Sequence, residues 1–268
     1  MLKDITIGQY FPGDSIIHRL DPRFKIIITL IYILMLFAGD HIICLGVGAV
    51  FTLIAIFLSK IPLKMFLKSI KPLLPFLFLT AFFNLVFVKS GDVIFKWKFI
   101  EITNEAISIS VFMFVRIILL IMGSSLLTYT TSPITLTDAI ERLLSPLKKV
   151  KLPVHELAMM MSIALRFIPT LIEETEKIMS AQKARGAEID SGSFMTRAKN
   201  MVAILVPLFI SSFRRADELA TAMECRCYRG GEGRTRLRQL KSAPRDYVAL
   251  GISVIFYATN IVIGIIMK

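Results

Sequence analysis

The residues best suited to chemistry in this chain are two arginines in matching surroundings. The stretch 178–186 can be laid without gaps on 219–227, so that Arg185 falls on Arg226 between small residues. Small neighbours let another surface approach the backbone closely, and a guanidinium pairs with a carboxylate through two parallel hydrogen bonds. The pattern predicts two equivalent docking points for a partner that presents two acidic pockets. These points comprise Ala184, Arg185, Gly186, Cys225, Arg226 and Cys227.

Simpler explanations exist for both residue types. An arginine near a helix C-terminus offsets the negative end of the helix dipole, by some tenths of a kcal/mol. One such arginine would need no other explanation, but two in the same local context favour docking. Cys225 and Cys227 could ligate a metal, yet the few histidines of the chain are scattered and complete no ligand set. We therefore expect small helix-face residues and no metal site.

Two long helices must position the arginines. Apolar residues recur at three- and four-residue steps from about residue 154 to beyond 185, and again from about 193 to 228. This spacing predicts two amphipathic helices with one arginine near the C-terminal end of each. Pro169 and Pro207 lie inside these helices and are expected to kink them.

The rest of the chain is largely hydrophobic. Of its 268 residues, 55% are hydrophobic and the mean hydropathy is +0.68, which is more apolar surface than one soluble core can hide. Five runs approach the roughly 20 residues that span a bilayer as a helix. The first two are separated by three residues and predict either a tight helical hairpin or one broken span. The runs are Phe24–Ala38, Ile42–Leu58, Ile70–Val88, Ala106–Tyr129 and Tyr247–Met267.

The net charge of +12 is distributed as membrane topology requires. Lysine and arginine are concentrated before the first run, between the second and third, and between the fourth and fifth. In membrane proteins such an excess of positive charge marks the cytoplasmic loops. The pattern predicts a multi-pass protein of the cell membrane with a cytoplasmic N-terminus and an extracellular C-terminus. No nucleic-acid-binding motif competes with this explanation. The first 23 residues also lack the apolar core of a cleaved signal peptide.

Five stretches, in order along the chain, carry a resemblance to a known family. They are "DPRFK" from Asp21, "SPLKK" from Ser145, "ALRFIPTLIEE" from Ala164, "AQKARG" from Ala181 and "AMECRCYRGGEGRT" from Ala222. Together the sequence resembles the transmembrane T component of energy-coupling factor (ECF) transporters. The resemblance covers most of the chain, and its motifs occur at the expected separations.

The resemblance implies a coupling subunit of an importer for vitamins or other micronutrients. In this family a T component joins two ATP-binding-cassette (ABC) ATPases to a membrane-embedded S component that binds the substrate. The ATPases dock at two Ala-Arg-Gly motifs; the first is matched as Ala184-Arg185-Gly186, and the second departs as Cys225-Arg226-Cys227. The apolar faces of the long helices carry the S component. The candidate contacts are Met160, Met161, Leu165, Ile168, Leu205, Leu208 and Phe209.

The expected architecture is therefore an all-α integral membrane protein with about five transmembrane helices and a cytoplasmic or interfacial domain of long, kinked coupling helices. Residues 1–129 form the N-terminal membrane domain, 130–245 the coupling domain and 246–268 the last transmembrane helix. We expect no catalytic residues and no cofactor in this chain, because "GGEGRT" from Gly230 lacks the lysine of a P-loop. ATP and magnesium would be bound by the partner ATPases.

Two other classes of function fit the sequence less well. A membrane-embedded phosphatidyltransferase would need a cluster of aspartates to hold divalent metal, which is not found around Arg185 or Arg226. A self-sufficient secondary transporter or a membrane scaffold is the alternative, although the internal repeat lies outside the expected spans. Arg116 lies midway along the fourth run, where an ionisable group is either functional or paired. A structural contact is favoured for it, with Asn84 as a candidate partner.

Overall fold

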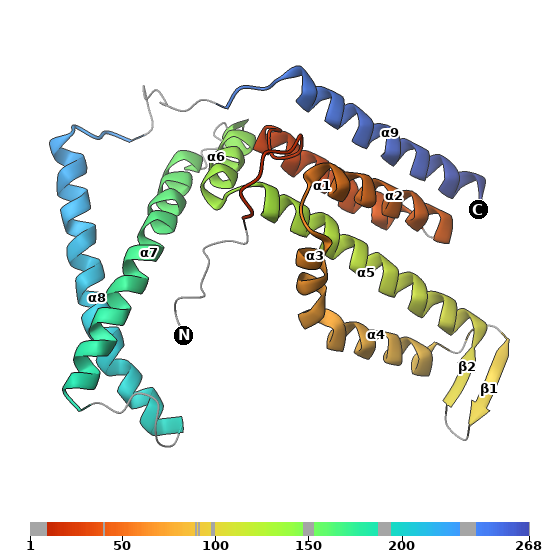
Figure 1. The fold of residues 1–268 in the computed structure, drawn as a ribbon, viewed down its shortest axis with the longest axis horizontal. Helices are drawn as coiled ribbons and strands as arrows, with labels where there is room; N and C mark the ends of the chain where they lie inside the picture. The colour runs from red at the N-terminus through yellow and green to blue at the C-terminus, as the bar shows by residue number, and fades with distance from the viewer. Residues whose placement is uncertain are drawn as a thin grey trace. The chain divides into compact units, whose positions relative to one another are not determined.

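Helices make up most of the described structure (Figure 1). The computed structural model describes residues 10–39, 41–88, 90, 92–97, 100–146, 153–186, 194–230 and 240–267. It divides into two compact units, one of residues 9–139 with 240–268 and one that includes residues 140–239. The first unit is a bundle of apolar helices, and the second contains the two long amphipathic helices.

The helices of the bundle follow the apolar runs of the sequence. They are α1 (Pro22–Ala38), α2 (Ile42–Ser59), α3 (Leu63–Ile70), the short 3₁₀ helix η1 (Lys71–Leu73), α4 (Leu74–Phe87), α5 (Asn104–Thr130) and α9 (Pro244–Ile266). α6 (Pro133–Leu144) follows α5. The first two runs form two helices packed against each other, so the predicted hairpin is confirmed and the single broken span is not.

Among the described residues, five helical segments are long and apolar enough to cross a membrane. Four of them correspond to the predicted second, third, fourth and fifth runs, and the third is built from α3, η1 and α4 over Leu63–Phe87. The remaining segment is α7 (Val154–Ala184), which the sequence predicted to be an amphipathic helix outside the spans. α1, with 17 residues, is shorter than these five, but it packs against α2, α5 and α9. The all-α membrane architecture is confirmed.

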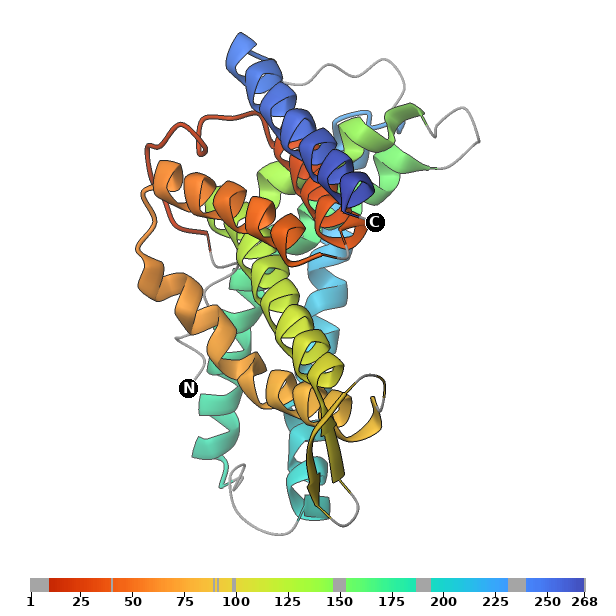
Figure 2. The ribbon, with the colours of Figure 1, turned by 90° about the vertical axis from the view of Figure 1, so that its right-hand side faces the viewer.

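A short hairpin was missed by the sequence analysis. Strands β1 (Val93–Trp97) and β2 (Ile100–Thr103) pair antiparallel directly before α5 (Figure 2). The signal was present, because β-branched and aromatic residues alternate with charged ones in this segment. Its position between two apolar helices made it look like a simple loop.

Small residues allow the bundle helices to approach closely. A Cβ atom on Gly123 of α5 would overlap the ring of Tyr32, and one on Gly48 of α2 would meet Leu36. Tyr32 is 3% exposed, and its hydroxyl contacts Thr52 Oγ1 at 2.6 Å and donates to the carbonyl of Leu119 at 2.9 Å. Close contact through small residues, with buried polar groups bonded across helices, is how membrane helices associate without a hydrophobic drive between them.

Charged side chains join the start of α1 to the start of α9. Asp21 caps α1 by accepting a hydrogen bond from the backbone N–H of Arg23 at 2.9 Å. The backbone N–H of Asp21 in turn donates to Oδ1 of Asp246 at 2.9 Å, and Oδ2 of Asp246 accepts from the N–H of Ala243 at 2.6 Å. Asp246 is 1% exposed, so its charge is stabilised by these donors rather than by water.

Lys25 of α1 joins the C-terminal end of α5 to this cluster of helix ends. Its ammonium donates to the carbonyl oxygens of Thr130 at 2.8 Å and His18 at 3.2 Å and to the hydroxyl of Thr131 at 3.3 Å. A lysine has three N–H donors, so all three are used. The "DPRFK" motif thus has a structural reason, because Asp21 and Lys25 gather three helix ends around one buried cluster.

Arg116 makes a structural contact inside the bundle, as the sequence favoured, but its described hydrogen bond is to Gly39 and not to the candidate partner Asn84. Its Nη2 donates to the carbonyl of Gly39 at 2.6 Å, which is the cap of α1 at its C-terminal end. The guanidinium also lies 4.4 Å from the ring centre of Phe112. A cation at the negative end of a helix, stacked on an aromatic ring, is stabilised by both.

We expect the substitution Asp246→Asn to destabilise the bundle. An amide offers a donor where the carboxylate accepts from two N–H groups, so one buried N–H loses its partner at a cost of about 1–3 kcal/mol. Thermal unfolding in detergent, followed by circular dichroism, should show a lower Tm. Asp14→Asn is the matched control because the Asp14 side chain is 86% exposed and pairs only at the surface. Equal Tm values for the two variants would contradict the role of Asp246.

Candidate docking site

The long helices α7 (Val154–Ala184) and α8 (Phe194–Cys225) form an antiparallel pair. Gln182 Nε2 donates to the carbonyl of Ala203 at 3.2 Å, and Arg215 Nη2 lies 3.1 Å from Glu174 Oε2. Later positions in α7 therefore meet earlier positions in α8, and Figure 1 shows the two helices crossing. The sequence did not predict these two contacts, because they arise only when two separate helices meet.

The two helix ends have the same backbone geometry. α7 ends directly before Arg185 and α8 directly before Arg226. The next residue is in the left-handed conformation in each case, with φ of +84° at Gly186 and +55° at Cys227. Each of these residues donates its N–H to the carbonyl three positions earlier, at 3.0 Å and 2.8 Å. The equivalence predicted from sequence similarity is thus repeated in the local fold.

The six residues of the two ends are all exposed. The structure does not bring the arginines together, because antiparallel helices place their C-termini at opposite ends of the pair. Arg226 lies about 23 residues beyond the part of α8 that meets Gln182, so the ends are of the order of 35 Å apart at about 1.5 Å per residue. This arrangement suits two separate pockets on a partner rather than one shared pocket.

Cys227 replaces the glycine that usually occupies such a helix end. Glycine takes a left-handed conformation without steric cost, whereas a residue with a Cβ is strained by roughly 1–2 kcal/mol. The thiol is small and exposed, so the strain lies in the backbone rather than in packing. The second end therefore keeps the shape of the first despite a different sequence.

The predicted apolar contact face remains largely open. Met160, Met161, Leu205 and Phe209 are 54%, 42%, 55% and 65% exposed. Leu165, Ile168 and Leu208 are partly buried. Several exposed apolar side chains on two neighbouring helices mark an interaction surface or a membrane contact. The assignment of these residues to an S component stays a prediction.

The predicted kink positions both lie inside continuous helices, Pro169 in α7 and Pro207 in α8. A proline removes one backbone hydrogen bond and crowds the preceding turn. The kinks themselves stay predictions. The stretch from Gly231 to Thr235, part of the glycine-rich segment that lacks the P-loop lysine, lies outside the described residues.

The start of α7 is anchored by a buried polar pair. Nδ1 of His155 lies 3.1 Å from Oε1 of Glu141 in α6, and both side chains are less than one-fifth exposed. Val154 and Ala158 of the same turn are buried. Within the residues that the structure describes, no group of three or more metal-ligating side chains is found.

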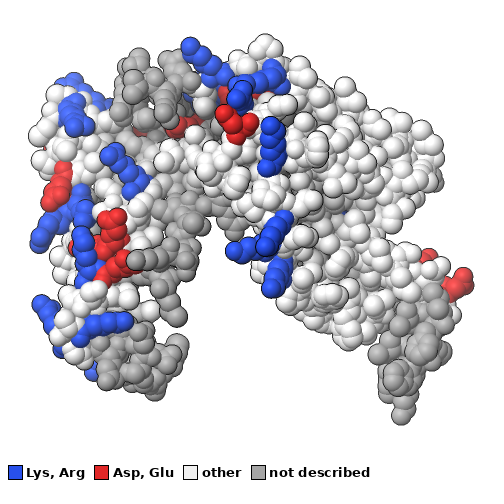
Figure 3. All heavy atoms as spheres, viewed as in Figure 1, with Lys and Arg blue, Asp and Glu red and all other residues white. Residues whose placement is uncertain are grey.

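Basic and acidic side chains are interspersed over α7 and α8, whereas the bundle surface in the same view is mostly uncharged (Figure 3).

We predict that the two helix ends respond in opposite ways to changes at the left-handed residue. Gly186→Ala should destabilise the last turn of α7 by roughly 1–2 kcal/mol, and Cys227→Gly should stabilise that of α8 by a similar amount. Amide hydrogen exchange should become faster at the first end and slower at the second. Gly251→Ala is the control, because its added Cβ meets no neighbour and α9 is unaffected. Unchanged exchange at both ends would show that the left-handed residue does not determine how they form.

Comparison with known proteins agrees with this architecture. Residues 13–237 match the family described as CbiQ, cobalt transport protein. A protein of Clostridium kluyveri is 57% identical over 93% of both chains, and one of Ruminiclostridium cellulolyticum is 54% identical over 96% of both. A third, of Thermosediminibacter oceani, is 52% identical over 100% of this chain and 98% of its own. All three are named energy-coupling factor transporter transmembrane protein EcfT. This chain therefore belongs to the CbiQ/EcfT family, the transmembrane components of energy-coupling factor transporters.

Proposed function

We propose that this chain couples two ABC ATPases to a substrate-binding S component in an importer of vitamins or other micronutrients. The observation that carries the proposal is the pair of equivalent, exposed helix ends at Arg185 and Arg226. Each end presents one guanidinium between residues with almost no side chain. Such an end fits an acidic pocket on a partner, and two equivalent ends fit two related ATPase subunits.

Energy supply belongs to the partners in this proposal. The chain itself hydrolyses no ATP, and ATP and magnesium are bound by the ATPases. The exposed apolar side chains around Met161 on α7 and around Phe209 on α8 hold the S component. Methionine-rich surfaces adapt to more than one partner, which suits a subunit that meets both ATPases and a membrane protein.

Coupling proceeds through the antiparallel helices. ATP binding closes the ATPase dimer, each arginine end moves with the subunit that holds it, and the angle between α7 and α8 changes. The S component resting on their apolar face is then reoriented or released. Pro169 and Pro207 make the helices bent levers. Pro169 precedes the part of α7 that contacts α8, and Pro207 lies within the part of α8 that contacts α7.

The orientation follows from charge distribution. The N-terminus and the coupling helices are cytoplasmic, where ATP is available, and the C-terminus is extracellular. The arginine ends are then on the side of the membrane where ABC ATPases act.

The first test is co-purification of the tagged chain from the membranes of its own host. Wild type should bring two ABC proteins and a small membrane protein, and Arg185→Glu/Arg226→Glu should lose the ABC proteins. Each lost arginine–carboxylate contact costs about 2–5 kcal/mol when buried, and the reversed charge adds repulsion.

Lys177→Glu/Arg214→Glu is the matched control, with two exposed basic residues reversed within the same helices but away from their ends. This control should retain the ABC proteins. Their loss from both variants would indicate general electrostatics rather than docking at the ends. An absence of ABC proteins even from wild type would leave a self-sufficient transporter or a scaffold as the working hypothesis.

The lever mechanism makes a separate prediction. Pro169→Ala/Pro207→Ala should leave the complex assembled but reduce ATP-driven uptake of the substrate bound by the co-purified S component, because straight helices transmit a different rotation. Pro133→Ala is the control, since this proline occupies the first position of α6 and interrupts no helix. Unaltered uptake in the double variant would exclude the levers while leaving docking intact.

A further inference from the structure

A groove of about 460 Å³ lies between α1, α2, α5 and α9. Its lining is almost wholly apolar, and its volume is within the roughly 300–1,000 Å³ of small-molecule sites. Tyr32 and Thr52 in the lining are buried, whereas Leu58 and Ile252 are 41% and 48% exposed. The exposed residues lie on helices expected to cross the membrane, so the groove is open to hydrocarbon.

The groove has the depth of one leaflet. Along α9 its lining extends from Arg245 to Phe256. This separation of about 11 residues corresponds to roughly 16 Å of helix. Half of a hydrocarbon core about 30 Å thick is similar. The groove begins at the charged helix ends, near Lys25 and Thr130, and ends among aromatic rings.

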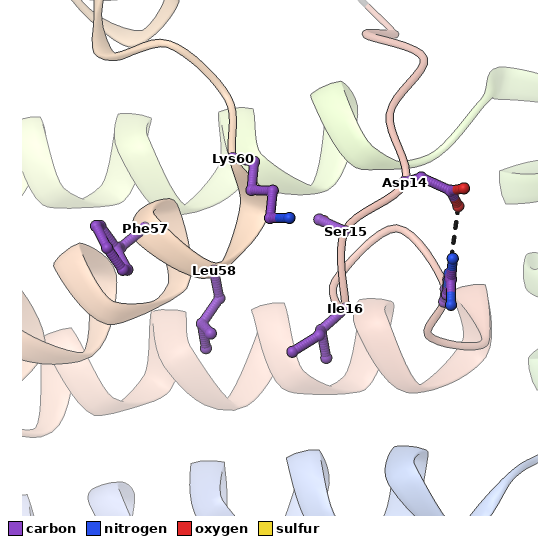
Figure 4. Close-up of a pocket in the computed structure, with 7 residues that line it drawn as sticks. Asp14, Ser15, Ile16, Phe57, Leu58 and Lys60 are labelled. Atoms are coloured by element: carbon purple, nitrogen blue, oxygen red, sulfur yellow. Dashed lines mark hydrogen bonds and ion pairs between the residues drawn. The ribbon is translucent and has the colours of Figure 1, made fainter.

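A second recess of about 260 Å³ adjoins the groove at its charged end. Ile16 and Leu58 line both spaces. In the recess, Lys60 directs its ammonium toward Ser15, while Ile16 and Leu58 point together toward α1 (Figure 4). A cationic pocket therefore continues directly into an apolar one.

The charges around this opening favour an anion. Arg19 and Lys60 line the recess and Arg245 lines the groove, all three exposed, and Asp14 is the single acid among the lining residues that the structure describes. Arg19 Nε is 3.2 Å from Asp14 Oδ1, and this hydrogen bond lowers the pKa of Asp14, so that Asp14 offsets one cation. In the described part of the chain, no carboxylate forms an ion pair with Lys60 or Arg245.

The buried Lys25 does not add to this site. Its three N–H donors are already bonded to Thr130, His18 and Thr131, so none is left for a ligand. The cations able to receive an anion are therefore those at the opening, and the interior of the groove can accept only an apolar chain.

We propose that the groove and its recess bind one anionic phospholipid. The phosphate lies at Lys60 and at the Nη groups of Arg19, whose Nε alone is bonded to Asp14, and an acyl chain extends between α1, α2, α5 and α9 toward Phe256. A phospholipid joins a compact negative group directly to a long apolar chain, which is the combination that the two connected spaces present. This site goes beyond the proposed coupling function and does not depend on it, because it belongs to the bundle alone.

The test is lipid binding by the purified full-length chain, measured by native mass spectrometry in detergent. Phosphatidylglycerol and phosphatidylcholine with identical acyl chains are titrated against each other. Wild type should prefer phosphatidylglycerol. Arg19→Gln/Lys60→Gln should reduce the preference roughly ten- to thirty-fold, since each cation near an anionic phospholipid surface contributes about a fivefold effect.

Two further variants locate the site. Lys64→Gln/Lys68→Gln removes the same charge from exposed positions on α3 outside the recess, and it should keep the preference. Ala249→Phe fills the groove and should weaken binding of both lipids. ABC ATPases are absent from the experiment, so failure of docking cannot change its result.

Three outcomes would overturn the proposal. Equal affinity of wild type for the two lipids would exclude a headgroup site. An equal loss of lipid preference in Arg19→Gln/Lys60→Gln and Lys64→Gln/Lys68→Gln would indicate surface charge alone. If a membrane protein co-purified with the Ala249→Cys variant, crosslinked to the new cysteine and excluded lipid, the groove would be assigned to a protein partner.

Discussion

The buried cluster around Asp21, Lys25 and Asp246 is the contact on which the bundle depends. Three helix ends meet there, and each carries polar groups that would be costly to leave unpaired away from water. The backbone of Asp21 is held by Asp246, and the ammonium of Lys25 is held by Thr130 and its neighbours. Apolar packing along the helices does not specify which ends lie together, because lipid is as apolar as the helices. Directional hydrogen bonds at one end supply that specificity.

The coupling helices solve a different problem from the bundle. Their ends must be open to partners, so Arg185 and Arg226 are exposed and their backbones end in the same turn. The similarity extends to Cys227, which takes a conformation that glycine would take more easily. The arginine and the shape of the turn are thus common to both ends, while the residue that makes the turn differs.

Much of the fold could be predicted from sequence because its signals are local. Apolar runs and amphipathic spacing gave the long helices, and the matched stretches around the two arginines indicated equivalent ends. The hairpin before α5 was missed because it is short and lies between helices. The status of α7 also differs, since its length and composition satisfy the criteria for a membrane span although its sequence predicts an amphipathic helix.

The sequence by itself determined the membrane class, the positions of most helices and the candidate docking arginines, since each depends on residues close together in the chain. Only the tertiary structure decided that Asp246 meets Asp21, that Arg116 binds the carbonyl of Gly39 and that four helices enclose an apolar groove. These contacts join residues far apart in sequence. Their existence depends on helix order and facing, which local composition does not encode.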